Sequence, residues 1–217
     1  MNSHRPRQPS QASDPIVYVV DDDASICRAL ARLLRSAGFE VQTFPSAKAF
    51  LDWPAPDRPA CLVLDIRMPG PSGLDLQSAL READRLLPIV FITGHGDVAT
   101  SVRAMKAGAV DFLQKPFDDQ ELLACVQRAL ETSRAQRAER AERAMLGERM
   151  ASLTPRERQV LRLVVTGMLN KQIADKLDIA EKTVKVHRGR VMEKMQAGSV
   201  ADLVRMTAKL GDGATIH

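Results

Sequence analysis

The chain has 217 residues, a length that accommodates one large domain or two small ones. Apolar residues make up 45% of the sequence and charged residues 27%, which is typical of a globular protein and excludes a collagen-like, disulfide-stapled or wholly disordered chain. The formal net charge of +4 is too small to mark the whole chain as a nucleic-acid binder.

The sequence predicts neither a membrane span nor an exported protein. The longest apolar runs cover residues 16–20 and 86–92, far short of the roughly 20 apolar residues that a transmembrane helix needs. Residues 1–14 are polar, lack the apolar segment of a secretion signal and are predicted to form a disordered tail. The three cysteines are dispersed without CxxC spacing, which predicts buried thiols in a reducing cytoplasm.

Residues 15–118 alternate short β-branched runs with amphipathic helical patterns. The predicted strands cover residues 16–20, 40–44, 61–64, 89–93 and 110–113. The predicted helices between them cover residues 24–37, 46–51, 72–83 and 97–107. The runs VYVV and CLVL lack polar alternation, as is typical of strands buried on both faces. The pattern therefore predicts an α/β domain with a doubly wound, five-stranded parallel sheet and helices on both faces.

Polar side chains stand at the ends of four of these strands, and in such sheets functional groups gather at the carboxyl ends. They are four acids, a hydroxyl and an ammonium: Asp21, Asp22, Asp23, Asp65, Thr93 and Lys115. Each piece alone is common in solvated loops and helix caps, but four successive strand ends favour one shared site. Carboxylates at one sheet edge repel each other and favour a hard divalent cation such as Mg²⁺. A carboxylate beside such an ion, a hydroxyl and an ammonium can accept a phosphoryl group.

The strings VVDDD, LDIRMPGPSG, ITGHGD and AMKAGAVDFLQKPF resemble the receiver domain of bacterial response regulators, in order and over roughly residues 15–130. The resemblance implies a flavodoxin-like fold in which Asp65 is the phosphoacceptor and Asp21 and Asp22 are the carboxylates of a Mg²⁺ site. It implies further that Arg67 gives its main-chain carbonyl to the metal and that Lys115 pairs with the phosphoryl group.

The same resemblance implies a switch pair. Thr93 supplies a hydroxyl that is drawn to the phosphoryl group, and Phe112 supplies an aromatic ring that turns inward behind it. From the residues alone, Phe112 is equally well a plain core residue. His95 is typical of a solvent-facing loop residue, with an effect on water access to the acyl phosphate as the alternative. Asp23 stands where the family often has Glu, and its role stays open.

Residues 119–149 are predicted to be the last receiver helix continuing into a linker helix. Three apolar residues spaced for one helix face are expected to pack on the sheet: Leu122, Val126 and Leu130. The run RAQRAERAERAM then favours an unbroken helix to residue 148, ~45 Å long. Its heptad spacing is poor, which favours a solvated, semi-rigid spacer over a coiled coil. A weak dimer contact that forms only when receivers pair stays open as the alternative.

Residues 150–212 show helical patterns and no strand pattern, and they predict a small all-α domain followed by a tail at residues 213–217. The predicted helices cover about residues 155–166, 170–177, 181–195 and 199–210. Asn170 is expected to cap the second helix. A helix, a short turn and a helix rich in Lys and Arg form the helix-turn-helix pattern.

The partition of charge agrees with two domains of opposite sign. Residues 14–118 carry 14 acids against 11 bases, residues 119–150 carry six of each, and residues 151–217 carry 12 bases against seven acids. The C-terminal surplus is typical of a small nucleic-acid-binding module. A solvated basic face on a structural bundle is the alternative that composition alone leaves open.

The string LTPRERQVLRLVVTGMLNKQIADKLDIAEKTVKVHRGRVMEKM resembles the LuxR-type DNA-binding domain. The resemblance implies that the third helix enters the major groove of duplex DNA and that the fourth helix dimerises. The residues implied to face base edges are Lys185, Val186 and Gly189, the likelier phosphate contacts are Lys182, Thr183, Arg190 and Lys194, and Arg188 is a further candidate. Gly189 stands where some relatives carry a base-reading side chain, and it favours close backbone approach instead.

With both resemblances, the chain is identified as a member of the FixJ/NarL-type response regulators, closest to the FixJ branch. They imply that a sensor histidine kinase phosphorylates Asp65 and that the face around the fourth helix and fifth strand then forms a homodimer. Two DNA-binding domains would occupy promoter half-sites and activate transcription, with RNA polymerase as a partner. In the unphosphorylated state, the DNA-binding domain is held against the receiver or the chain stays monomeric.

Two other classes of function are weighed against this one. The first is a phosphohydrolase that uses the Asp65 site on outside substrates, which the lack of a substrate-enclosing insertion between the strands disfavours. The expectation is therefore no enzymatic activity beyond Mg²⁺-dependent self-phosphorylation and dephosphorylation. The second is a phosphorylation-switched adaptor whose basic domain binds protein or RNA.

Overall fold

The computed structural model describes residues 14–54, 58–85, 87–94 and 98–211. The chain divides into two compact units, whose boundary lies between Arg137 and Ala138. That boundary falls inside helix α5 (Asp119–Ala151), so this helix contributes residues to both units. In the described part of the chain, no helix combines the length and the apolar character needed to cross a bilayer.

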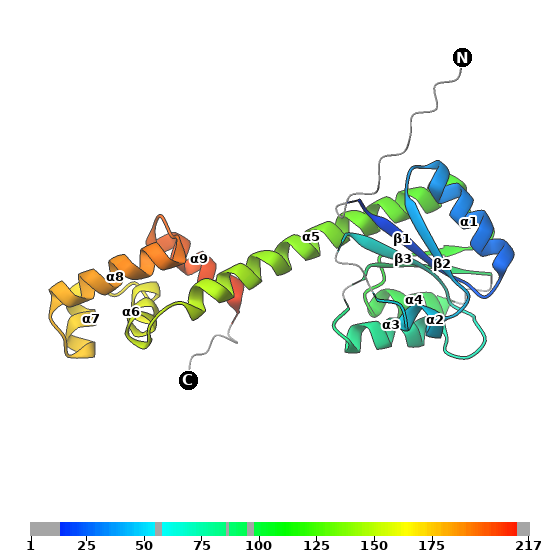
Figure 1. Ribbon diagram of the computed structural model, residues 1–217. Helices are drawn as coiled ribbons and strands as arrows, with labels where there is room; N and C mark the ends of the chain where they lie inside the picture. Colours follow the sequence, from blue (N-terminus) through cyan, green and yellow to red (C-terminus); the bar gives the residue numbers. More distant parts are fainter. Residues whose placement is uncertain (1–13, 55–57, 86, 95–97, 212–217) are drawn as a thin grey trace, which may run out of the picture. The chain divides into compact units, whose positions relative to one another are not determined.

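The first unit contains the predicted five-stranded sheet, in which every pair of neighbouring strands is parallel (Figure 1). Its strand order is β2-β1-β3-β4-β5. The strands are β1 (Ile16–Val20), β2 (Glu40–Phe44), β3 (Ala60–Asp65), β4 (Ile89–Thr93) and β5 (Asp111–Gln114). The predicted fold class is confirmed, with shifts of one residue at the ends of β3 and β5.

Two apolar cores sandwich the sheet, as the unalternating strand sequences require. Successive residues of β1 point to opposite faces, so Tyr18 joins one core while Val17 and Val19 join the other. Helices α2 (Ala47–Leu51), α3 (Gly73–Glu82) and α4 (Val98–Lys106) cover the Tyr18 face. Helix α1 (Ala24–Ser36) and the first half of α5 cover the other. The three central strands β1, β3 and β4 are thereby buried along their whole length, and polar groups can lie just beyond their carboxyl ends.

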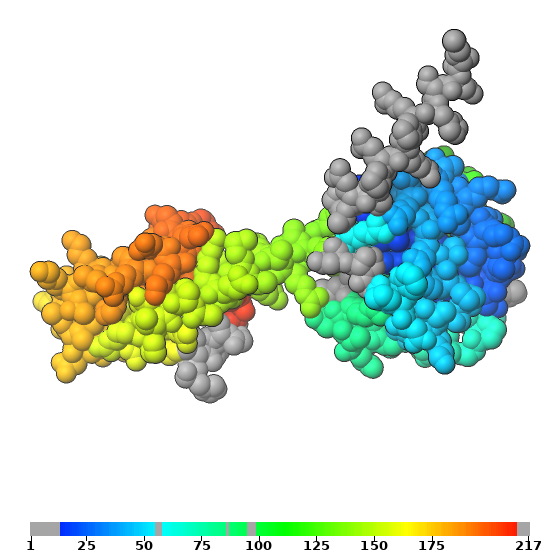
Figure 2. Space-filling view, in the orientation of Figure 1, coloured from blue at the N-terminus to red at the C-terminus, as the bar shows by residue number. Residues whose placement is uncertain are grey.

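Helix α5 is three residues longer than predicted, and its second half differs from the prediction. The first half buries Leu122, Val126 and Leu130 against the sheet, as the spacing indicated. The last turns are not a solvated spacer, because Leu146 is buried and Met150 packs against the core of the second unit. Figure 2 shows these yellow-green turns lying directly against the orange helices of that unit.

The second unit contains, besides the end of α5, the helices α6 (Pro155–Val165), α7 (Asn170–Leu177), α8 (Glu181–Met195) and α9 (Val200–Leu210). Thr154 caps α6 in a capping box with Glu157, and Pro155 takes the first helical position. The expected cap of α7 is wrong: Leu169 is the capping residue, and Asn170 is already helical. The side chain of Asn170 instead accepts a hydrogen bond from Arg188 of α8, 2.9 Å away.

Candidate functional site

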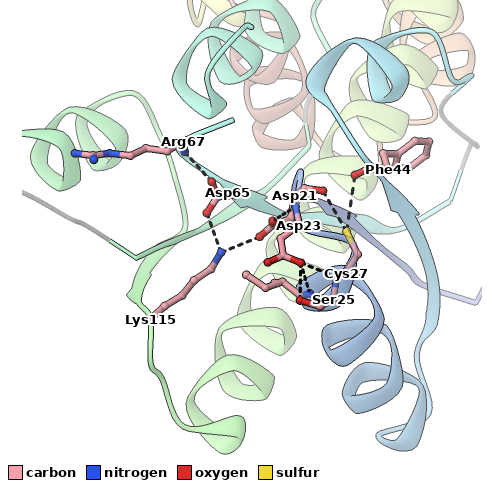
Figure 3. A network of polar contacts seen from close by, with 9 residues as sticks. Asp21, Asp23, Ser25, Cys27, Phe44, Asp65, Arg67 and Lys115 are labelled. Carbon is pink, nitrogen blue, oxygen red and sulfur yellow. Dashed lines mark hydrogen bonds and ion pairs between the residues drawn. The ribbon is translucent and has the colours of Figure 1, made fainter. Parts of the chain in front are cut away.

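Three of the predicted site residues meet at the carboxyl edge of the sheet (Figure 3). Val20 pairs with Leu64, so the next residues along, Asp21 and Asp65, stand side by side. The ammonium of Lys115, which follows β5, donates to Asp21 Oδ2 at 2.8 Å and to Asp65 Oδ1 at 2.9 Å. One cation thus bridges two carboxylates that come from different strands.

Burial makes this cluster electrostatically unusual. Asp21 is 2% exposed and Asp65 is 5% exposed. Burial raises the pKa of Asp65 above its ordinary value, and the hydrogen bonds and charge of Lys115 only partly offset that rise. Burial alone would lower the pKa of Lys115, but its bonds to Asp21 and Asp65 raise it instead. With both acids ionised, Lys115 leaves the buried trio with one net negative charge.

The loop after β3 holds the second oxygen of Asp65. The main-chain N–H of Arg67 donates to Asp65 Oδ2 at 2.8 Å, so both carboxylate oxygens have a donor. Gly73, the first residue of α3, lies against the same segment: a Cβ placed there would come 2.4 Å from the main-chain oxygen of Asp65. The sequence pattern predicts no role for Gly73, although this residue lies within the LDIRMPGPSG string that carries the resemblance.

The acids that follow β1 have different environments. Asp21 Oδ1 accepts from the main-chain N–H of Asp23 at 2.9 Å. Asp23 is the N-cap of α1 and accepts from the main-chain N–H of Ser25 at 2.7 Å, and the Ser25 bonds lower its pKa. Asp22 is exposed. Among the described residues, no three acids, histidines or cysteines are grouped closely enough to hold a metal, so Asp22 does not join Asp21 and Asp65 in one cluster.

The donor set nevertheless fits Mg²⁺. This ion is held in proteins by one or two carboxylates together with waters and phosphate oxygens, and does not need a cage of protein ligands. Asp21 and Asp65 supply two buried carboxylates, and their charge exceeds that of Lys115. Asp22 lies beside Asp21 in the chain and adds a further negative charge. An excess of negative charge around hard oxygen donors is the chemistry that a divalent cation relieves.

The predicted switch residues lie on β4, which pairs with the strand of Asp65, and on β5, which lies beyond β4 at the edge of the sheet. Thr93 is buried at the end of β4, and its carbonyl accepts from the main-chain N–H of Lys115 at 2.7 Å. Phe112 of β5 pairs in register with Phe91 and is half-buried against the core on that face. Phe112 therefore has the core contact expected of a core residue. It also keeps the partial exposure expected of a switch residue that can turn further inward. His95 lies outside the described residues.

In the second unit, helix α8 presents a polar, largely basic face. Val184, Val191 and Met195 are buried and fix the inner side of the helix. Six of the predicted DNA-contacting residues are exposed: Lys182, Thr183, Lys185, Val186, Gly189 and Arg190. The side chain of Val186 is apolar yet 48% exposed, as suits contact with a thymine methyl group in the major groove. No neighbouring atom lies within 4 Å of where a Cβ of Gly189 would be, so packing does not require glycine there.

Two predicted contacts, Arg188 and Lys194, are engaged inside the unit. Arg188 is half-buried and donates to Asn170, so one arm of its guanidinium is occupied. The ammonium of Lys194 donates to Glu157 Oε2 at 2.7 Å and to the carbonyl of Ser152 at 3.1 Å. Glu157 is 2% exposed, and the bond from Lys194 together with the cap at Thr154 lowers its pKa to about 2. Lys194 therefore neutralises this buried acid in the structure, and its contact with a DNA phosphate stays a prediction.

The sequence patterns of two families match the two units. The response regulator receiver domain matches residues 17–127, and the bacterial regulatory proteins of the luxR family match residues 151–207. Nodulation protein W of Bradyrhizobium diazoefficiens is 53% identical over 199 residues, which are 92% of this chain and 88% of that protein. The transcriptional regulatory protein FixJ of Rhizobium meliloti is 45% identical over 202 residues, 93% of this chain and 98% of that protein.

Two solved structures of response regulators resemble this chain along most of its length. The response regulator StyR has a TM-score of 0.80 and 50% identity, covering 91% of this chain and 100% of that one. Full-length FixJ from B. japonicum has a TM-score of 0.54 and 42% identity, covering 92% of this chain and 98% of that one. These matches confirm the resemblance that the motifs indicated. The chain belongs to the two-component response regulators that join a receiver domain to a LuxR-type DNA-binding domain and regulate transcription, alongside the FixJ proteins.

Proposed function

We propose that phosphorylation of Asp65 by a sensor histidine kinase converts the chain into a homodimer that binds specific promoter sites and activates transcription. The observation that carries the proposal is the bridge from Lys115 to Asp21 and Asp65. It brings two buried carboxylates and one cation together at the carboxyl edge of the sheet. A set of this kind can accept a phosphoryl group and neutralise its oxygens.

In the proposed step, an oxygen of Asp65 attacks the phosphorus of the donor phosphohistidine. The new O–P bond forms as the P–N bond breaks, and the histidine leaves with the bonding electrons. Lys115 is placed to transfer a hydrogen bond from the Asp65 carboxylate to a phosphoryl oxygen, because its ammonium already reaches Asp65 Oδ1. The main-chain N–H of Arg67 continues to donate its hydrogen bond to Asp65 Oδ2.

Asp21 and Asp65, with Asp22 and the main-chain carbonyl of Arg67 as the further ligands that the family implies, would hold Mg²⁺. When bound, this ion neutralises developing charge on the phosphoryl oxygens. Asp21 is fixed for that role by the Asp23 N–H on one oxygen and Lys115 on the other. Receiver domains in general use Mg²⁺ at the phosphorylation site.

We further propose that the switch passes through Thr93 to helix α4. The Thr93 hydroxyl would donate to the phosphoryl group, and Phe112 would turn further into the core behind it. Val102 and Met105, spaced to share one face of α4, are 43% and 45% exposed. Exposed apolar side chains beside β5 suit a dimer surface. Dimerisation would place two DNA-binding units on neighbouring half-sites and raise their effective concentration there.

The proposed partners follow from this scheme: a sensor kinase, duplex DNA and, for activation, RNA polymerase. A cytoplasmic location is part of the proposal, supported by three buried cysteines without a disulfide. We propose no turnover of outside substrates, because in this scheme the phosphoryl group stays covalently bound to Asp65.

The proposal is tested by incubating the chain with Mg²⁺ and a small phosphodonor such as acetyl phosphate. The expected result is about one acyl phosphate per chain, chemically mapped to Asp65 and lost in Asp65→Asn. Asp22→Asn serves as a comparison in which the acceptor remains. Multiple turnover of the donor without a stable phosphoprotein would favour a phosphohydrolase, and equal labelling of Asp65→Asn would contradict the assigned acceptor.

A further inference from the structure

The end of the DNA-reading helix α8 is fastened to the last turn of α5. The guanidinium of Arg149 donates to Gln196 Oε1 at 2.5 Å and to the carbonyl of Met195 at 3.3 Å. The preceding residue, Lys194, donates to the carbonyl of Ser152. Three successive residues at the end of α8 are therefore all bonded to residues 149–152. Each contact lies within the second unit.

Arg149 is chemically suited to this place. The last carbonyls of an α-helix have no partner within the helix, and a cation there also complements the helix dipole. Gln196, which follows α8, has a left-handed backbone with φ of 55°, so the helix ends there. The planar fork of Arg149 reaches the main-chain carbonyl and the side-chain amide together. A lysine presents a compact point charge and cannot reproduce that paired geometry.

The contact sets the position of the groove-facing residues, since Lys185 and Val186 lie on the same 15-residue helix. Such a helix is about 22 Å long and behaves as a rod, so holding its last residues fixes the pitch of its exposed face. Recognition contacts must be held within about 0.5 Å to be productive. We infer that Arg149, in the linker helix, is a positioning residue for sequence-specific DNA binding. This inference rests on the DNA binding proposed above.

The inference also joins the two functions of the chain through one element. Helix α5 begins with the residues that pack on the receiver sheet, among them Leu122 and Val126. It ends with the residue that holds the DNA-reading helix. Any displacement of the last turn of α5 therefore moves the recognition helix with it. Through the contacts of Arg149 with Met195 and Gln196, a change in the linker helix would alter the sequence specificity of DNA binding. It would not alter only the affinity for the phosphate backbone.

The test uses the full chain, with variants Arg149→Ala, Arg149→Lys and Gln196→Ala. The control is Arg143→Ala, which removes the same charge from the same helix, where Arg143 makes an exposed pair with Glu139 at 3.4 Å. A DNA site is first selected from random duplexes with the unaltered protein in Mg²⁺ and beryllofluoride. The affinity for that site and for a scrambled duplex is then measured at several salt concentrations, together with the rate of Asp65 phosphorylation.

We expect Arg149→Ala and Gln196→Ala to weaken binding to the selected site by about tenfold, the loss typical of one charge-assisted hydrogen bond. Binding to scrambled DNA should fall less than threefold, as in the Arg143→Ala control, and phosphorylation should be unchanged. Arg149→Lys keeps the charge and should still lose most of the specificity. The double variant Arg149→Ala/Gln196→Ala should lose no more than either single variant.

Equal losses on selected and scrambled DNA, or full rescue by Arg149→Lys, would overturn the inference, because Arg149 would then act only through its charge. Should Arg149→Ala lower the folded fraction, the two milder variants decide the question. The inference and the proposed function fail differently. If the unaltered protein selects no DNA sequence, the proposed function is wrong. If it selects one and the Arg149 variants retain that preference, only the positioning role is wrong.

Discussion

The substitution Glu157→Gln removes a buried carboxylate from the junction of α6 and α8 with almost no change of shape. In the folded chain, this carboxylate accepts from the ammonium of Lys194 at 2.7 Å and from the main-chain N–H of Thr154 at 2.9 Å. Glutamine can accept the second bond but cannot neutralise the cation. We therefore expect the second unit to lose stability while the receiver unit does not.

The size and pH range of the effect follow from the pKa of Glu157, about 2 against an ordinary 4.5. A carboxyl whose pKa is lower in the folded chain than in the unfolded chain contributes its full stabilisation at pH values above its pKa in the unfolded chain. That contribution is lost as the pH falls through the pKa of the carboxyl in the folded chain. At 1.36 kcal/mol per pKa unit, and with Lys194 33% exposed to solvent, the contribution is about 1 to 3 kcal/mol at pH 7. It declines from about pH 4.5 to pH 2.

The chain allows the two units to be observed separately. Its single tryptophan, Trp53, and its single tyrosine, Tyr18, both lie in the first unit. Urea unfolding followed by far-ultraviolet circular dichroism reports the helices of both units, and Trp53 fluorescence reports only the first. Glu157→Gln should lower the urea midpoint of the second unit at pH 7 and leave the fluorescence transition in place.

Acidification supplies the decisive comparison. The stability difference between the unaltered chain and Glu157→Gln should shrink on going from pH 7 to about pH 2.5, because the carboxyl is then almost fully protonated in the unfolded chain and about one quarter protonated in the folded chain. Glu193→Gln makes the same chemical change at an exposed position of α8 and should shift neither transition. A difference as large at pH 2.5 as at pH 7, or none at either pH, would refute the role assigned to the Glu157–Lys194 pair.

Four further substitutions test the two sites. Lys115→Met leaves the buried acids without their shared cation, so the pKa of Asp65 should rise further, measured by carboxyl NMR titration, and acetyl phosphate labelling should slow at least tenfold. Gly73→Ala should destabilise the first unit by about 1 to 3 kcal/mol in Trp53 fluorescence unfolding, because its Cβ meets the Asp65 carbonyl. Gly189→Ala, with open space around it, should instead stabilise α8 by about 0.5 to 1 kcal/mol in circular dichroism. Lys185→Ala should reduce the salt slope of DNA binding by about one in fluorescence anisotropy titrations. Slopes or midpoints that do not move would contradict these assignments.

The fold is readable from the sequence where its signals are local. Runs such as CLVL are apolar on both faces, Ser72 and Thr154 mark helix starts, and strand ends carry the acids that the sheet brings together. The spacing also held a signal for Arg188, which follows Val184 by four residues and precedes Val191 by three. Those intervals place it on the inner side of α8.

What the sequence could not supply depends on residues far apart in the chain. Lys194 lies at the flank of the buried face, and only Glu157, 37 residues earlier, draws it inward. The end of α5 reads as solvated because its run of Arg, Glu and Ala is polar. Its partners, Met195 and Gln196, come 46 and 47 residues later than Arg149. The tight contact of Gly73 with Asp65 likewise exists only once α3 folds back on β3.

The central claim is that a phosphoryl group on Asp65 controls DNA binding. It is tested most directly by titrating the selected DNA duplex with the full chain in Mg²⁺, with and without beryllofluoride, for the unaltered protein and for Asp65→Asn. Beryllofluoride stands in for the phosphoryl group on the carboxylate. We expect beryllofluoride to make the unaltered chain dimeric in light scattering and to tighten its DNA binding at least tenfold. Neither property should change in Asp65→Asn. An identical response of both proteins, or tight binding that ignores beryllofluoride, would contradict the central claim.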